Sequence, residues 1–163
     1  MIYDILDVID TELRHDTRGI NARVAQVNAL KFPTSPRSYI DDINEILTWD
    51  LKKLPSEMQM PTVQLVWNGS RDLQPISQGK WRGDHLISIN FWTDKRASSE
   101  ARKSIAIWAH AGRLLVDYLP DNSDLIDEVR DVSFDVAGWA GSGRIYTWMA
   151  LTFRLKERDE FPE

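Results

Sequence analysis

Two consecutive segments decide the fold: HLISINFWT (85–93) and, after a short connection, SSEARKSIAIWAHAGRLLVDYL (98–119). In the first segment Ile87, Ile89 and Phe91 alternate with residues of the opposite face, and this period of two predicts a strand. In the second segment apolar residues recur every three or four positions, which predicts a long amphipathic helix. We therefore expect a sheet with this long helix packed on one face.

Three further segments also have strand character. Alternating apolar residues predict strands over 62–67, 132–136 and 144–156. The last two flank a glycine-containing turn, Gly138-Trp139-Ala140-Gly141-Ser142-Gly143, and should pair as an antiparallel hairpin. With 85–93 this makes a mainly antiparallel, four-stranded sheet, with a long loop over 68–84 between its first two strands.

The N-terminal region is predicted to be helical. Apolar spacing predicts a helix over 2–15, a short helix over 20–30 with a strand as second choice, and a helix over 36–54 that starts at Ser35-Pro36. One short helical turn is expected over 123–130. Because helices and strands are segregated along the chain, the class is α+β, in a single domain 1–163 with a helical region over 1–58 and a sheet-and-helix core over 60–157. Gly112 lies inside the long helix, where glycine costs about 1 kcal/mol, and indicates a close approach to a strand.

The composition excludes several functions. The chain has 163 residues, with 20 basic and 25 acidic side chains, a formal net charge of -5 and no cysteine. The acidic balance argues against a general nucleic-acid binder. The missing cysteine excludes disulfides, thiolate zinc sites and cysteine nucleophiles. No apolar run is long enough for a membrane span, and the acidic start of the chain is unlike a signal peptide. The missing cysteine also fits synthesis in the cytoplasm.

No catalytic motif is found. The three histidines, His15, His85 and His110, do not have the spacing of a metal-binding helix. No nucleophile elbow or phosphate-binding glycine loop occurs, since the glycines at 138–143 fit a hairpin turn. The sequence therefore predicts no enzyme, with no catalytic residue, no cofactor and no metal.

Two features point instead to assembly. Seven tryptophans are many for this length, and those at 81, 92, 139 and 148 fall in loops or on the face opposite the expected core. Tryptophan is enriched at protein interfaces. Loop 68–84 is longer than usual and carries basic residues, which favours contact with a partner chain. The candidate interface residues are Arg71, Lys80, Trp81, Arg82, Trp92, Trp139, Arg144 and Trp148.

The order of elements resembles the tail terminator and tail-completion proteins of tailed bacteriophages. The resemblance rests on the Pro-initiated strand PTVQLVW (61–67), the strand end NFWTD (90–94), the helix start SSEA (98–101) and the closing strand LTFRL (151–155). It covers residues 60–157 and, in outline, residues 1–15. The helix expected over 36–54 departs from the family pattern as an insertion.

This resemblance implies a homo-oligomeric ring, usually a hexamer, at the head-proximal end of the tail tube. The ring would end tube polymerisation, contact the tail tube protein and dock to the head-tail connector protein, as a virion component made in the host cytoplasm. DNA would pass through its lumen without specific binding. A head-completion, connector or minor tail protein is the nearest alternative. A small cytoplasmic enzyme with scattered site residues and a monomeric binding module are the more distant ones.

Overall fold

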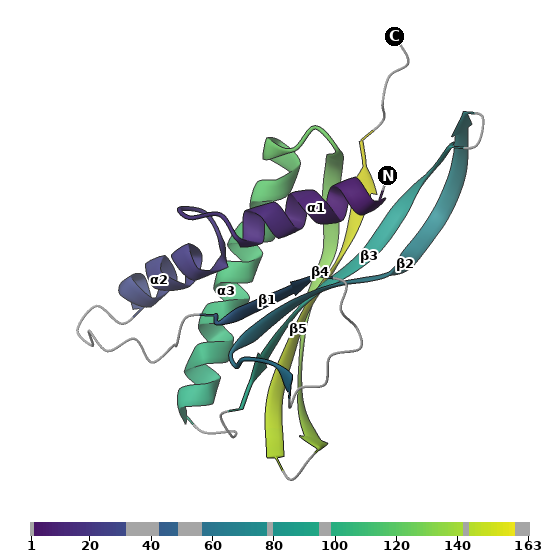
Figure 1. The fold of residues 1–163 in the computed structure, drawn as a ribbon. Coiled ribbons are helices and arrows are strands. Elements are labelled where there is room, and N and C mark those ends of the chain that lie inside the picture. The colour runs from purple at the N-terminus through teal and green to yellow at the C-terminus, as the bar shows by residue number, and fades with distance from the viewer. Residues whose placement is uncertain are drawn as a thin grey trace.

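The computed structural model describes residues 2–31, 43–48, 57–77, 80–94, 99–141 and 144–158. These residues form three helices and five strands (Figure 1). In chain order they are α1 (Ile2–Leu13), α2 (Ile20–Lys31), β1 (Glu45–Thr48), β2 (Thr62–Ser77), β3 (Lys80–Thr93), α3 (Ser99–Asn122), β4 (Ile126–Gly141) and β5 (Arg144–Glu157). None of the described helices is long and apolar enough to cross a membrane.

The sheet differs from the expected one. It has five strands in the order β1-β2-β3-β5-β4 and is mixed, because β1 runs parallel to β2 while the other pairs are antiparallel. The expected mainly antiparallel four-stranded sheet is therefore wrong. The predicted hairpin of the last two strands is confirmed, with Ala140 paired to Ile145 and Val136 to Met149.

The error lies in the segment 36–54, for which the sequence predicts one helix. Its described residues, 43–48, end in strand β1, and the rest lies outside the described residues. Tertiary contacts hold β1 extended. The side chain of Asn21 accepts a hydrogen bond from the Ile43 N–H and donates one to the Ile43 carbonyl, and the Asn44 N–H donates to the Pro61 carbonyl at 2.9 Å. Such long-range bonds override a local helical period.

Two further expectations are corrected. The long loop 68–84 is mostly strand, because β2 continues to Ser77 and β3 begins at Lys80. Register shifts after Trp67, Arg71 and Pro75 break the period of two and hide the strand in the sequence. The short helix over 123–130 is also wrong, since β4 begins at Ile126. The Arg158 N–H donates to the Leu125 carbonyl at 2.9 Å, which fixes the extended start of β4.

All three helices share one core with a single face of the sheet. The core contains the inward residues of α1, together with Ile87, Ile89 and Phe91 of β3, as the sequence predicted. Trp108 of α3 stacks on Phe91 with ring centroids 5.8 Å apart. A Cβ built on Gly112 would lie 2.8 Å from Leu151 Cδ2 and 3.4 Å from Phe91 Cζ, so the predicted close approach of this glycine to the strands is confirmed.

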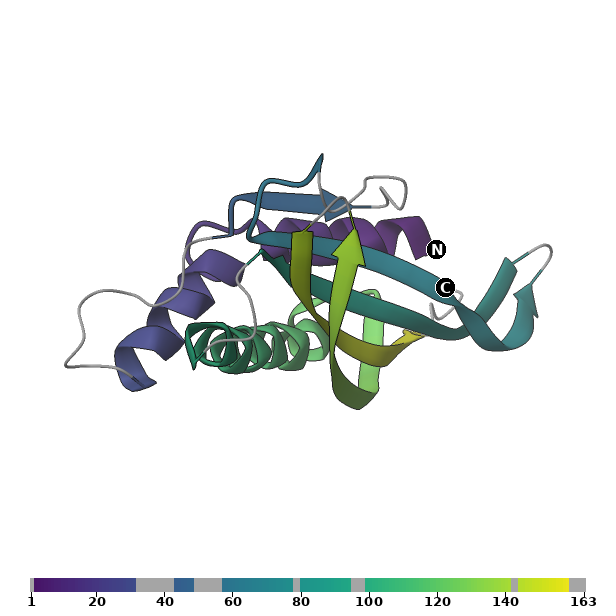
Figure 2. The ribbon, with the colours of Figure 1, turned by 90° about the horizontal axis from the view of Figure 1, so that it is seen from below.

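Two β-hairpins project beyond the helices at opposite ends of the sheet (Figures 1 and 2). One consists of residues 68–77 and 80–84, and is called the β2–β3 arm. The other consists of residues 137–141 and 144–148, and is called the β4–β5 arm. Each arm is continuous with the central sheet through the pairing of its own strands. The sheet therefore presents two separate, differently composed ends.

Candidate functional site

The eight candidate interface residues fall into two groups, one at each arm. Arg71, Lys80, Trp81 and Arg82 lie on the β2–β3 arm, where Arg71 is exposed and Arg82 half-buried. Trp139, Arg144 and Trp148 lie on the β4–β5 arm, and Trp92 lies on β3 beside its base. The side chains of Lys80, Trp81, Trp139 and Arg144 lie outside the described ones. The structure brings each group together but keeps the two groups apart.

Trp92 and Trp148 form the contact within the second group. They are cross-strand partners on β3 and β5, and their ring centroids lie 6.1 Å apart with the planes tilted by 49°. Their neighbours in sequence, Phe91 and Met149, point into the helix-covered core, so both tryptophans lie on the opposite face. Both are half-buried. The expectation that they lie outside the helix-covered face is confirmed.

A charged cluster lies at the base of the β2–β3 arm, and sequence reasoning missed it. Its centre is Asp84 of β3, whose side chain is only 8% exposed. Asp84 accepts hydrogen bonds from Arg130 of β4 and, at 2.9 Å, from Arg154 of β5. The carboxylate of Asp84 raises the pKa of the Arg130 guanidinium. One carboxylate thus joins three strands, β3, β4 and β5.

Two aspartates on irregular backbone complete this cluster. Asp72 and Asp131 have φ angles of 52° and 54°, the left-handed region that non-glycine residues seldom occupy. Each lies in a register shift, of β2 and β4 respectively. Their carboxylates lie 3.0 Å and 3.5 Å from the guanidinium of Arg154. Because its members come from four strands, no short sequence motif could have predicted this cluster.

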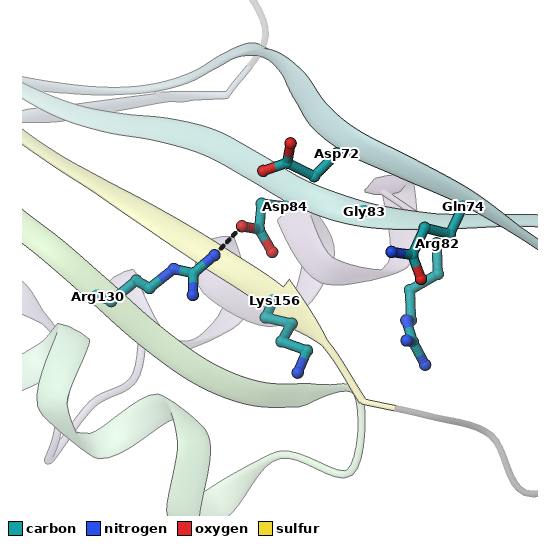
Figure 3. Close-up of a pocket in the computed structure, with 7 residues that line it drawn as sticks. All are labelled: Asp72, Gln74, Arg82, Gly83, Asp84, Arg130 and Lys156. Carbon is teal, nitrogen blue, oxygen red and sulfur yellow. Dashed lines mark hydrogen bonds and ion pairs between the residues drawn. The ribbon is translucent and has the colours of Figure 1, made fainter.

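The charged cluster borders a shallow pocket of about 210 Å³ (Figure 3). Its lining residues are Asp72, Gln74, Arg82, Gly83, Asp84, Arg130 and Lys156. The lining thus contains three cationic side chains and two carboxylates, and Asp84 is paired with its arginines. Arg82 and Lys156 point away from both carboxylates (Figure 3), and Lys156 lies 3.6 Å from Asp127. This arrangement suits a carboxylate-bearing surface of a partner more than a cation.

A serine, a histidine and a glutamate also meet near the base of the arm. Ser70 Oγ lies 2.6 Å from His85 Nδ1, and His85 Nε2 lies 3.4 Å from Glu157 Oε1. These residue types are those of a nucleophile, a base and an acid. The pocket beside the charged cluster is not lined by any of the three. His85 is buried between β2 and β5, and its ring packs edge-on against Trp67.

Metal ligation has no candidate among the described residues, where no three histidine, aspartate or glutamate side chains gather suitably. A scan against models of protein families finds no match to this chain, and a search of curated proteins finds none either.

Proposed function

We propose that this chain is a structural, non-catalytic virion protein, a tail terminator of a tailed bacteriophage. It forms a ring on the head-proximal end of the tail tube and joins the tube to the head connector. The observation that supports this most directly is the pair of arms at opposite ends of one sheet (Figure 1). A ring needs two different surfaces on each subunit, one for each neighbour or docking partner, and the arms supply them.

The two arms differ in chemistry as such a role requires. The β2–β3 arm carries Arg71 and Arg82 beside the charged cluster, and it suits an acidic surface on a neighbour or on the tube. The β4–β5 arm carries three of the chain's seven tryptophans within or beside it, Trp92, Trp139 and Trp148. Aromatic residues bury large areas at low entropic cost and suit a packed contact. Six subunits would carry 6 × (-5) = -30 formal charges, which would keep DNA from adhering to the lumen.

The test is assembly in the presence of tail tubes. In the presence of tail tubes the purified chain should form rings on the tube ends, visible by electron microscopy and measurable by mass photometry. The combined variant Trp81→Ala, Arg71→Glu, Arg82→Glu should keep the fold and lose the rings. Arg113→Glu is the matched control, since Arg113 is exposed on α3 and pairs locally with Asp117. A chain that forms no ring and leaves tubes uncapped would overturn the proposal.

Catalysis is tested separately. We expect no hydrolysis of ester substrates and no metal-dependent cleavage of DNA by the pure chain. Activity that disappears in Ser70→Ala or His85→Gln would show that the Ser70–His85–Glu157 group is a catalytic site and would overturn the non-catalytic assignment.

A further inference from the structure

β4 is an edge strand of the sheet. The half of β4 that pairs regularly with β5 has no strand on its other side among the described residues. From Ser133 to Gly141 it pairs with β5 in unbroken register, from Ser133↔Thr152 to Gly141↔Arg144. In an edge strand alternate residues direct their N–H and C=O groups away from the sheet. Residues 133–138 of this segment are all exposed. A row of backbone donors and acceptors is therefore available to another strand.

The side chains of this edge favour contact with protein. The segment SFDVAGWAG (133–141) contains no lysine and no proline, the residues that usually protect an edge, and one charge, Asp135. Phe134 is 41% exposed and Val136 57% exposed, although both lie on the core face of the sheet, paired with Leu151 and Met149. The helices do not cover this end of the face.

The other described edges are protected. On β1, Arg14 of α1 donates a hydrogen bond to the Ile46 carbonyl at 2.7 Å. The Thr48 hydroxyl donates one to the Asp10 carboxylate of the same helix, which holds α1 beside this edge. The outer half of β2, beyond its pairing with β1, is interrupted by the register shifts described above and by Pro75. A second copy of this chain therefore offers one good complement to an open β4, namely its own β4.

We propose that two copies of the free chain pair through β4, antiparallel, about a two-fold axis at Ala137. In this register Phe134 lies opposite Ala140 and Val136 opposite Gly138, so large residues face small ones. Asp135 lies opposite Trp139 and far from the other Asp135. An axis at Asp135 would place two carboxylates directly opposite each other, which is unfavourable. The two five-stranded sheets then join into one sheet of ten strands.

This pairing is independent of the proposed ring. A ring with one face on a tube and the other on a connector has no two-fold axis between neighbours, so the pairing belongs to the free chain and is released on assembly. Failure of the ring experiment therefore leaves the pairing untouched. Absence of the pairing likewise leaves the ring proposal standing.

The register is tested by cysteine cross-linking, because the natural chain has no cysteine. Ala137→Cys places two thiols at the axis, where directly opposed Cα atoms lie about 4.5–5.5 Å apart, within disulfide range. Under mild oxidation this variant should form a disulfide-linked dimer. Ser133→Cys is the control, since it is exposed on the same strand but lies opposite Gly141. Equal cross-linking of both variants would overturn the proposed register.

The edge itself is tested by sedimentation without cross-linking. The chain should sediment as a concentration-dependent dimer, and Val136→Lys should raise the dissociation constant by about tenfold or more. Leu114→Lys is the matched control because Leu114 is an apolar residue of α3 that is 45% exposed. A monomer at all concentrations, or a dimer unaffected by Val136→Lys, would overturn the proposal. Circular dichroism of both variants establishes that each remains folded.

Discussion

Asp72 and Asp131, 59 residues apart in the sequence, have the same left-handed backbone and bind the same guanidinium, that of Arg154. Each lies where its strand is out of register with its neighbour. The two irregularities thus turn carboxylates from both sides of β3 and β5 toward one arginine. Aspartate tolerates this conformation better than most residues, which accounts for its use at both positions.

The left-handed backbone at Asp131 leads to a testable prediction about the stability of two variants. Asp131→Ala and Asp131→Gly both remove the carboxylate, but only glycine occupies a φ of 54° without strain. We expect the glycine variant to be more stable than the alanine variant by about 1 kcal/mol. In a regular strand the order would be reversed. Urea unfolding of both variants measures the difference, and equal midpoints would contradict a strained backbone at this residue.

Asp84 should be the most sensitive member of the charged cluster. Asp84→Ala leaves Arg130 and Arg154 without their buried carboxylate and should lower the free energy of unfolding by about 3 kcal/mol. Asp117→Ala is the control, because its pair with Arg113 is exposed at both ends and should cost less than about 0.5 kcal/mol. Similar losses in the two variants would show that the cluster does not stabilise the sheet.

Gly112→Ala tests the close packing of α3 on the sheet. Alanine gains about 1 kcal/mol of helix propensity. The added methyl group meets Leu151 at 2.8 Å in the core, and such overpacking costs about 1–3 kcal/mol. We expect net destabilisation by about 1 kcal/mol. His110→Ala on the exposed side of the same helix should be neutral or stabilising. A thermal unfolding midpoint that rises in Gly112→Ala would contradict the packing argument.

Glu157 should contribute a pH-dependent stability. Burial raises the pKa of Glu157 and the neighbouring His85 lowers it, and the net pKa lies below the usual 4.5. The folded state therefore binds this proton less readily than the unfolded chain does. The stabilisation is present above about pH 4.5 and is lost as the pH falls through the folded-state pKa. The stability difference between the natural chain and Glu157→Gln should be larger at pH 7 than at pH 3. An equal difference at both pH values would contradict this linkage.

The sequence predicted what local periodicity specifies. The core faces of α1 and α3, the strand through Ile87, Ile89 and Phe91, and the final hairpin all have regular spacing and all are found. The sequence-based prediction failed for elements whose conformation depends on contacts between residues far apart in the chain. The strand β1 is four residues long and depends on contacts with α1, α2 and Pro61. In the β2–β3 arm, register shifts interrupt the alternation of apolar and polar residues, so the sequence shows no strand there.

For the same reason, only part of the candidate site could be predicted from the sequence. Trp92 and Trp148 are found outside the helix-covered face because alternation in a strand is strict. The charged cluster and the Ser70–His85–Glu157 group could not be found from one sequence. Their members are brought together only by the strand order, and by two aspartates whose backbone departs from the regular strand.

The hydrogen bond from Arg14 to the Ile46 carbonyl has a consequence for the number of chains that can join edge to edge. A sheet open on both sides can add copies without limit and grow into a fibre. Here the β1 edge of the sheet is contacted by the chain's own helix α1, so two copies that pair through β4 have no other regular open edge to offer among the described strands. Growth in this direction then stops at two, and loss of Arg14 would remove one restraint on open-ended polymerisation.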